Sequence, residues 1–223
     1  MKIKSFRGSR GLWGLGVAIA LSLPACLVPP FSEIQDARLA GQGKIELTPF
    51  ASTISASNEG ETSHIQNNFG IQAGVGVLSF MDFRLRYEYL NHPKSGSEYD
   101  SSYGAHVLAG GPKFSLVKDI LALSLPVGFA FGGDVESSET WQFHPTLIAT
   151  APLAKALTMS LSAKALIPLQ SGGNTLYAVN LGMGITPNGS PVTIRPEAGI
   201  LFDTEGSGFD FHLSLGLSFR IGR

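Results

Sequence analysis

The last stretch of the chain alternates strictly between two kinds of side chain. In FDFHLSLGLSFRI, residues 209–221, every odd position is apolar, while the even positions carry charge, imidazole, hydroxyl or only hydrogen. A period of two indicates a β-strand, because successive side chains point to opposite faces. Small residues dominate the polar face, whereas a soluble sheet would expose Lys, Glu and Thr there. Such a strand fits a barrel with an apolar exterior and a crowded polar interior.

The same alternation recurs between turn signals along the whole chain. It predicts ten strands, at about 44–55, 68–79, 82–91, 102–116, 120–132, 141–151, 156–169, 176–186, 192–202 and 209–221. Most runs are long enough for a tilted strand to cross a bilayer, which takes about 9–11 residues. Gly110, Gly111 and Pro112 interrupt the fourth run and suggest a bulge, which leaves eight strands as the alternative.

Composition and loop lengths favour the same fold class, an all-β, closed antiparallel transmembrane β-barrel. Charged residues make up only 15% of the 223 residues, against about 25% in ordinary domains. Long polar connections alternate with short ones such as SFMD and PLAK. Outer-membrane barrels have short periplasmic turns and longer outer loops. An even strand count then places both ends of the barrel, residues 43–223, on the periplasmic side.

The N-terminus predicts export and a lipid anchor. Residues 1–25 combine four cationic residues with an apolar run, as in a secretory signal peptide that is removed. The sequence LPAC, which ends at Cys26, resembles the lipobox of bacterial lipoproteins, and the resemblance implies cleavage before Cys26 and acylation of its thiol. Cys26 is the only cysteine, so no intrachain disulfide can form. Residues 26–42, rich in proline and glycine, are interpreted as a tether between this anchor and the barrel.

The stretch DARLAGQGKIELTPF, residues 36–50, resembles the segment that precedes the first strand in several families of small bacterial outer-membrane barrels, of the OmpA and OmpW kind. The resemblance implies an outer-membrane protein of a Gram-negative cell envelope. It concerns fold and location, and it implies no particular activity.

Strand parity points one set of charged side chains into the barrel. Charges in a narrow lumen must pair, because an isolated buried charge is costly. We therefore expect an ion-pair network that plugs the lumen, with a narrow pore for small solutes as the alternative. The predicted network consists of Glu46, Arg84, Arg86, Glu88, Lys113, Lys164, Arg195, Glu197 and Arg220.

The outer loops are acidic, with nine carboxylate residues against a single lysine, Lys94. This charge suits solubility and ion bridging beside lipopolysaccharide, or attraction for divalent cations or a cationic partner. The expected partners are therefore outer-membrane lipid, lipopolysaccharide and an envelope protein, with the barrel itself monomeric. Nucleic acid is not expected, because no basic patch with interleaved aromatics occurs.

The sequence does not indicate an enzyme. None of the five histidines stands at a metal-ligand spacing from another, and no Ser-His-acid set can be read from spacing. We expect no catalytic residues, cofactor or metal, and a structural or interaction role. A surface enzyme that hydrolyses lipid or peptide is the second alternative, for which His106 and His144 are candidates.

Overall fold

The computed structural model describes residues 27–58, 60–93, 103–133, 135, 140–188, 190–204 and 208–222. The predicted signal peptide and the predicted acylation site at Cys26 fall outside these ranges. Within the described residues, no helix is long and apolar enough to cross a membrane.

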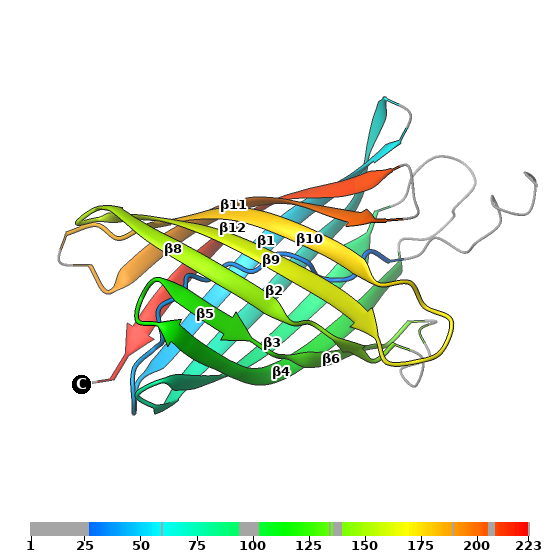
Figure 1. The fold of residues 1–223 in the computed structure, drawn as a ribbon. Coiled ribbons are helices and arrows are strands. Elements are labelled where there is room, and N and C mark those ends of the chain that lie inside the picture. Colours follow the sequence, from blue (N-terminus) through cyan, green and yellow to red (C-terminus); the bar gives the residue numbers. More distant parts are fainter. Residues whose placement is uncertain are drawn as a thin grey trace, which may run out of the picture.

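The described chain folds into a closed antiparallel β-barrel (Figure 1). Its strands are β1 (Ile45–Asn58), β2 (Glu61–Leu78), β3 (Met81–His92), β4 (Tyr103–Val117), β5 (Leu121–Ser124), β6 (Val127–Phe131), β7 (Gln142–Phe143), β8 (Thr146–Ala154), β9 (Leu157–Pro168), β10 (Leu176–Ile185), β11 (Val192–Asp203) and β12 (Phe209–Ile221). Strands β5 and β6 act as one interrupted strand, and so do β7 and β8, because each pair continues along the same neighbours. Pairing of β1 with β12 closes the barrel at the predicted ten strands.

Prolines cause the two interruptions. Pro126 separates β5 from β6, and Pro145 separates β7 from β8. A proline has no N–H to give to the ladder, so regular pairing stops there. Leu125 N–H still bonds to the carbonyl oxygen of Pro112, and His144 N–H to that of Pro126, both at 2.9 Å. The barrel wall therefore stays closed across the interruptions.

The bulge predicted at Gly110–Pro112 is wrong. The β3–β4 ladder runs without a register shift from Met81 opposite Phe114 to His92 opposite Tyr103. A side chain at Gly111 would collide with the backbone of Leu125. Gly111 therefore allows the next strand to approach closely, and β4 is continuous.

The outer surface of the barrel is a continuous apolar band. Leu161, Leu181 and Leu213 lie on different strands, and each is more than half exposed. Trp141 and Tyr177 are exposed near the long-loop end, and Phe80 is exposed at the opposite turn. Apolar strand faces with aromatics toward both ends are typical of a barrel in contact with lipid.

Residues 27–42, called the lumen segment below, run through the inside of the barrel (Figure 1, blue). Among them Phe31, Ile34, Asp36 and Ala37 are at most 1% exposed. The structure thus differs from the tether interpreted from the sequence, because this segment belongs to the barrel interior. A stretch with two prolines forms no regular backbone hydrogen bonds of its own. Its buried backbone groups therefore need hydrogen-bond partners on the lumen wall.

The lumen segment has a definite direction. Near its start, Val28 and Phe31 pack with Ile54, Leu166 and Leu201, which lie toward the long-loop ends of their strands. Near its end, Ala40 N–H donates to Asp82 at the start of β3, and Gln42 bridges to Gly76 near the end of β2. The segment therefore passes from the long-loop end to the short-turn end, where β1 begins.

Candidate functional site in the lumen

The nine charged residues predicted for the lumen all lie on strands of the lumen wall. Glu46, Arg84, Glu88, Lys113, Lys164, Arg195 and Glu197 are buried. The Arg86 side chain is mostly buried, at 11% exposed, whereas that of Arg220 is 36% exposed and lies near the short-turn end. Each buried member has at least one polar partner inside the barrel.

One cluster of these charges lies toward the short-turn end. Glu46 accepts from Arg84 at 2.9 Å and from Arg220 at 2.8 Å, so that its carboxylate joins β1 to β3 and β12. Arg84 also bonds Asp82 at 2.8 Å. Asp82 was missed from the sequence, although it has the same parity as Arg84 and directly follows the β2–β3 turn.

A second cluster lies on β3, closer to the long loops. Arg86 pairs with Glu88 at 2.7 Å, as expected for residues two apart on one face. The other oxygen of Glu88 accepts from Asn68 of β2 at 2.7 Å. Arg86 also donates to the carbonyl and hydroxyl oxygens of Ser32, both at 2.7 Å, and so connects the wall to the lumen segment.

Arg195 and Glu197, two residues apart on the same face of β11, each contact the lumen segment. Arg195 lies 3.3 Å from the Asp36 carboxylate. Glu197 accepts the backbone N–H groups of Glu33 and Ile34, at 2.7 and 2.8 Å. The lumen segment lies against β11 and offers both wall residues closer partners than they offer each other.

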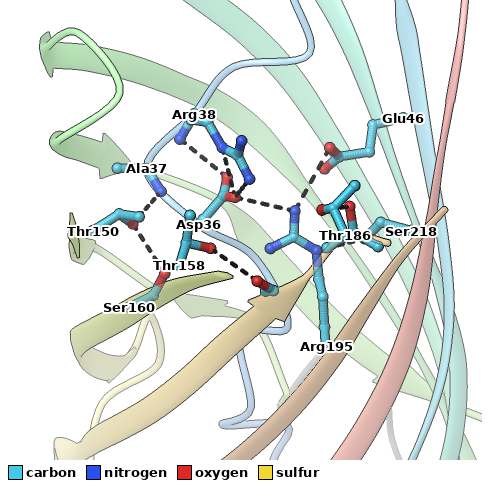
Figure 2. A network of polar contacts seen from close by, with 12 residues as sticks. Asp36, Ala37, Arg38, Glu46, Thr150, Thr158, Ser160, Thr186, Arg195 and Ser218 are labelled. Carbon is cyan, nitrogen blue, oxygen red and sulfur yellow. Dashed lines mark hydrogen bonds and ion pairs between the residues drawn. The ribbon is translucent and has the colours of Figure 1, made fainter. Parts of the chain in front are cut away.

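Asp36 is the centre of the largest of these networks (Figure 2). Its carboxylate pairs with Arg38 at 2.7 Å within the segment and with Arg195 on the wall. Arg195 also bonds Ser218 at 2.6 Å and lies 3.9 Å from Glu46. The network thus connects the segment to three strands of the wall.

Two lysines extend the ionic contacts between wall and segment. Lys164 pairs with Glu33 at 2.6 Å. Lys113 donates instead to the backbone carbonyls of Asp36 and Arg38, at 2.6 and 3.0 Å. In the predicted set plus Asp82, the wall has six cations and four carboxylates. Glu33 and Asp36 of the lumen segment supply two further carboxylates.

The wall also satisfies the backbone of the lumen segment. Gln66 both accepts from Val28 N–H and donates to its carbonyl, each at 2.9 Å. Asn180 donates to the carbonyl of Phe31 at 2.9 Å, and Thr150 accepts from Ala37 N–H at 2.8 Å. Buried backbone groups need hydrogen-bond partners, and these polar side chains of the wall supply them, so they fix the position of the segment.

Glycines on the wall make room for the segment. An added Cβ at Gly216 would collide with the side chain of Ile34, and one at Gly76 with the carbonyl of Gly41. Ile34 itself has a φ of 52°, a region that a β-branched residue rarely adopts. Its N–H bond to Glu197 and its complete burial fix this conformation.

Little space remains beside the segment. A cavity of about 30 Å³ is lined in part by Glu33, Gln35, Gln72 and Arg84. This volume has room for about two water molecules. Among the described residues, Gln35, Gln72 and Arg84 each have a buried polar atom with no protein partner, which suits water in this cavity.

The long-loop mouth is more open. A cavity of about 310 Å³ has apolar walls that include Leu176 and Leu201, and it also contains Asp203 and Asp210. Of the nine acidic loop residues, the described part of the chain contains only Glu61, which is exposed, and Asp203. The other seven, together with Lys94, fall outside the described residues.

The candidate hydrolase residues do not come together. His106 faces outward, where Nδ1 lies 2.8 Å from the Tyr87 hydroxyl and the ring stacks on Phe131. His144 is buried and faces the lumen, where it bonds Gln142 at 3.0 Å. Nor does any group of three or more His, Cys, Asp or Glu in the described chain have a geometry that could hold a metal ion.

No family model matches the chain, and no curated protein matches it. Similar solved structures include Ail of Yersinia pestis (10% identity, 81% of this chain and 99% of that chain covered, TM-score 0.40). The translocator domain of the autotransporter NalP from Neisseria meningitidis is another (9%, 81% and 89%, 0.44). The outer membrane protease OmpT of Escherichia coli is a third (9%, 80% and 95%, 0.38). These likenesses concern the barrel architecture and say nothing of this chain's activity.

The closed wall and the apolar outer band define the class of protein from its own residues. Only a closed barrel lets strands cross a bilayer with every backbone group paired. The chain is therefore a transmembrane β-barrel of the kind found in bacterial outer membranes.

Proposed function

We propose that this protein has a structural or interaction role in the outer membrane, and that its lumen is closed by the lumen segment and the ion pairs around it. The observation that carries this proposal is the burial of residues 30–37 without a break inside the barrel. A barrel that conducts solutes needs a continuous aqueous path, whereas these residues occupy the middle of the lumen.

The energetics support a closed state that persists. Asp36 and Glu33 form ion pairs with Arg195 and Lys164 where water is scarce. Breaking a buried pair from one side costs about 3–5 kcal/mol. Displacement of the whole segment would break both pairs together with its backbone hydrogen bonds, so the proposed closed state dominates.

A narrow pore is the second candidate, and the charge on the wall favours it. Without the lumen segment, the predicted set and Asp82 would leave six cations against four carboxylates along the middle and short-turn part of the wall, while Asp203 and Asp210 line the long-loop mouth. The cation-rich part of such a lumen would attract anions. The second candidate therefore applies to a state in which the segment has left the lumen, and small anionic solutes are its expected cargo.

Recording of single molecules in planar bilayers tests the proposal. The full chain should show no steady conductance. A Glu33→Ala/Asp36→Ala double variant should show frequent openings, because the segment loses both ionic contacts with the wall. A Glu61→Ala variant, changed only at an exposed residue of the β1–β2 hairpin, should stay as silent as the wild type. Steady, large conductance from the wild type would overturn the closed lumen.

A further inference from the structure

We infer that the lumen segment starts at the outer face of the membrane, so that the chain enters the barrel at Leu27 on the opposite side from the end of β12. This inference rests on the proposed placement of the barrel in the outer membrane. It goes beyond closure of the lumen, because it concerns the side on which the chain leaves the barrel.

The lumen segment starts at the long-loop end of the barrel. Gln66 holds the backbone of Val28 by two hydrogen bonds. Gln66 pairs with Ile54, and both lie on the part of the β1–β2 hairpin that leads to its tip at Asn58 and Glu61. Figure 1 shows the start of the blue segment at the end of the barrel where the longer loops gather. That end is the external one in outer-membrane barrels.

The lumen segment ends at the short-turn end of the barrel. Gly43 N–H bonds the carbonyl of Gly76 at 2.9 Å, beside the short β2–β3 turn. Ile45, the first residue of β1, pairs with Ile221, the last residue of β12. The segment's end and the end of β12 therefore share the short-turn side, and the segment's start lies on the other side.

The side chains of the lumen segment match their surroundings in the barrel in only one of the two directions in which the segment could run. Phe31 lies in an apolar cluster near the long loops, while Asp36 lies among cations further inside. A reversed segment would bring Phe31 toward the arginines and Asp36 toward Leu166 and Leu201. Burial of a charge in apolar surroundings is costly, so the sequence of the segment selects one direction.

The direction of the lumen segment decides on which side of the membrane the predicted lipid anchor lies. Cys26 is one peptide unit from Leu27, and consecutive Cα atoms are about 3.8 Å apart. If Cys26 is acylated as predicted, the acyl chain would therefore be attached on the outer side of the membrane. The tether expected from the sequence would have placed it in the periplasmic leaflet.

Three chains, each with one short unstructured epitope, test this inference in intact cells. The first has the epitope between Cys26 and Leu27, the second at Gly60 in the β1–β2 hairpin, and the third after Arg223. An antibody added to intact cells should bind the first two chains at similar levels. It should bind the third only after the outer membrane is permeabilised.

Two results would overturn the inference. The first is a Cys26–Leu27 epitope that is hidden in intact cells while the Gly60 epitope is accessible. The second is an epitope after Arg223 that is accessible while the Gly60 epitope is hidden, because the barrel would then have the opposite orientation. Neither result depends on conductance, so failure of the closed-lumen proposal would be recognised separately.

Discussion

The Glu197 carboxylate of β11 accepts the backbone N–H of Glu33 at 2.7 Å and that of Ile34 at 2.8 Å. One wall side chain thus holds two successive peptide groups of the lumen segment, more than 160 residues earlier in the chain. The contact explains why a carboxylate on β11 turns away from Arg195, two residues before it on the same face.

Replacement of Glu197 by alanine should loosen the lumen segment. The change leaves two buried N–H groups without an acceptor, at a cost of about 1–3 kcal/mol each. We expect Glu197→Ala to unfold at a lower temperature than the wild type, measured by the gel shift of the folded barrel in detergent. The control Glu61→Ala, at an exposed hairpin residue, should unfold with the wild type. If Glu197→Ala unfolded at the same temperature as the wild type, Glu197 would not belong to the network that holds the segment.

Loss of charge at Asp36 should make the barrel leak anions. Asp36→Asn keeps the shape of the side chain but removes the carboxylate that pairs with Arg38 and is nearest to Arg195, which then has only Glu46 at 3.9 Å. The middle and short-turn part of the wall has six cations against four carboxylates in the predicted set plus Asp82, so an opening that passes there favours anions. Reversal potentials in a salt gradient across a planar bilayer measure this selectivity. Cation-selective openings, or none beyond those of a Glu61→Gln control, would count against the network.

A methyl group at Gly216 should be destabilising mainly because the lumen is filled. In an empty barrel the new Cβ would meet only wall atoms, the nearest of them in the Thr48 side chain at 3.2 Å. Replacing a strand glycine by alanine, which is worth about 0.5–1 kcal/mol, would offset that contact. Here the new Cβ collides with Ile34, and overpacking of this kind typically costs about 1–3 kcal/mol. Gly110→Ala is the matched control, because its Cβ would meet no atom closer than 3.4 Å. Equal unfolding temperatures for the two variants would argue against a filled lumen.

The acylation predicted at Cys26 should be independent of barrel folding. Cys26→Ser should abolish incorporation of radiolabelled palmitate and leave an unprocessed precursor, while the barrel still forms because its stability comes from the strands. Incorporation of label in wild-type cells and the gel shift of the folded barrel serve as the two controls. Palmitate in the Cys26→Ser protein would contradict the lipobox interpretation.

The wall of the barrel was predictable from the sequence because alternation is a local property. Strand β12, for example, has the same bounds in the structure as its pattern indicated, residues 209–221. The lumen segment was not predictable in this way. Pro29 and Pro30 disrupt any period, and the contacts of Glu33 and Asp36 span more than a hundred residues of sequence.

One signal did point to missing partners. The predicted lumen set contains six cations but only three carboxylates, Glu46, Glu88 and Glu197. A narrow interior does not tolerate such an excess, so further carboxylates had to come from elsewhere. Asp82 supplies one, and Glu33 and Asp36 of the lumen segment supply two more. Strand parity could have identified Asp82, whereas only the structure could identify Glu33 and Asp36, because nothing local to those two residues places them inside.

Chemical accessibility of Ser32 tests most directly whether the lumen segment fills the barrel. In the Cys26→Ser chain, Ser32→Cys and Ser63→Cys each introduce the only thiol, with nearly the same change in side-chain size. Ser32 is 3% exposed inside the barrel, and Ser63 is exposed on the β1–β2 hairpin. In the barrel folded in detergent, a maleimide should label Ser63→Cys rapidly and Ser32→Cys only after the barrel is unfolded. Equally rapid labelling of both thiols in the folded barrel would contradict the filled lumen.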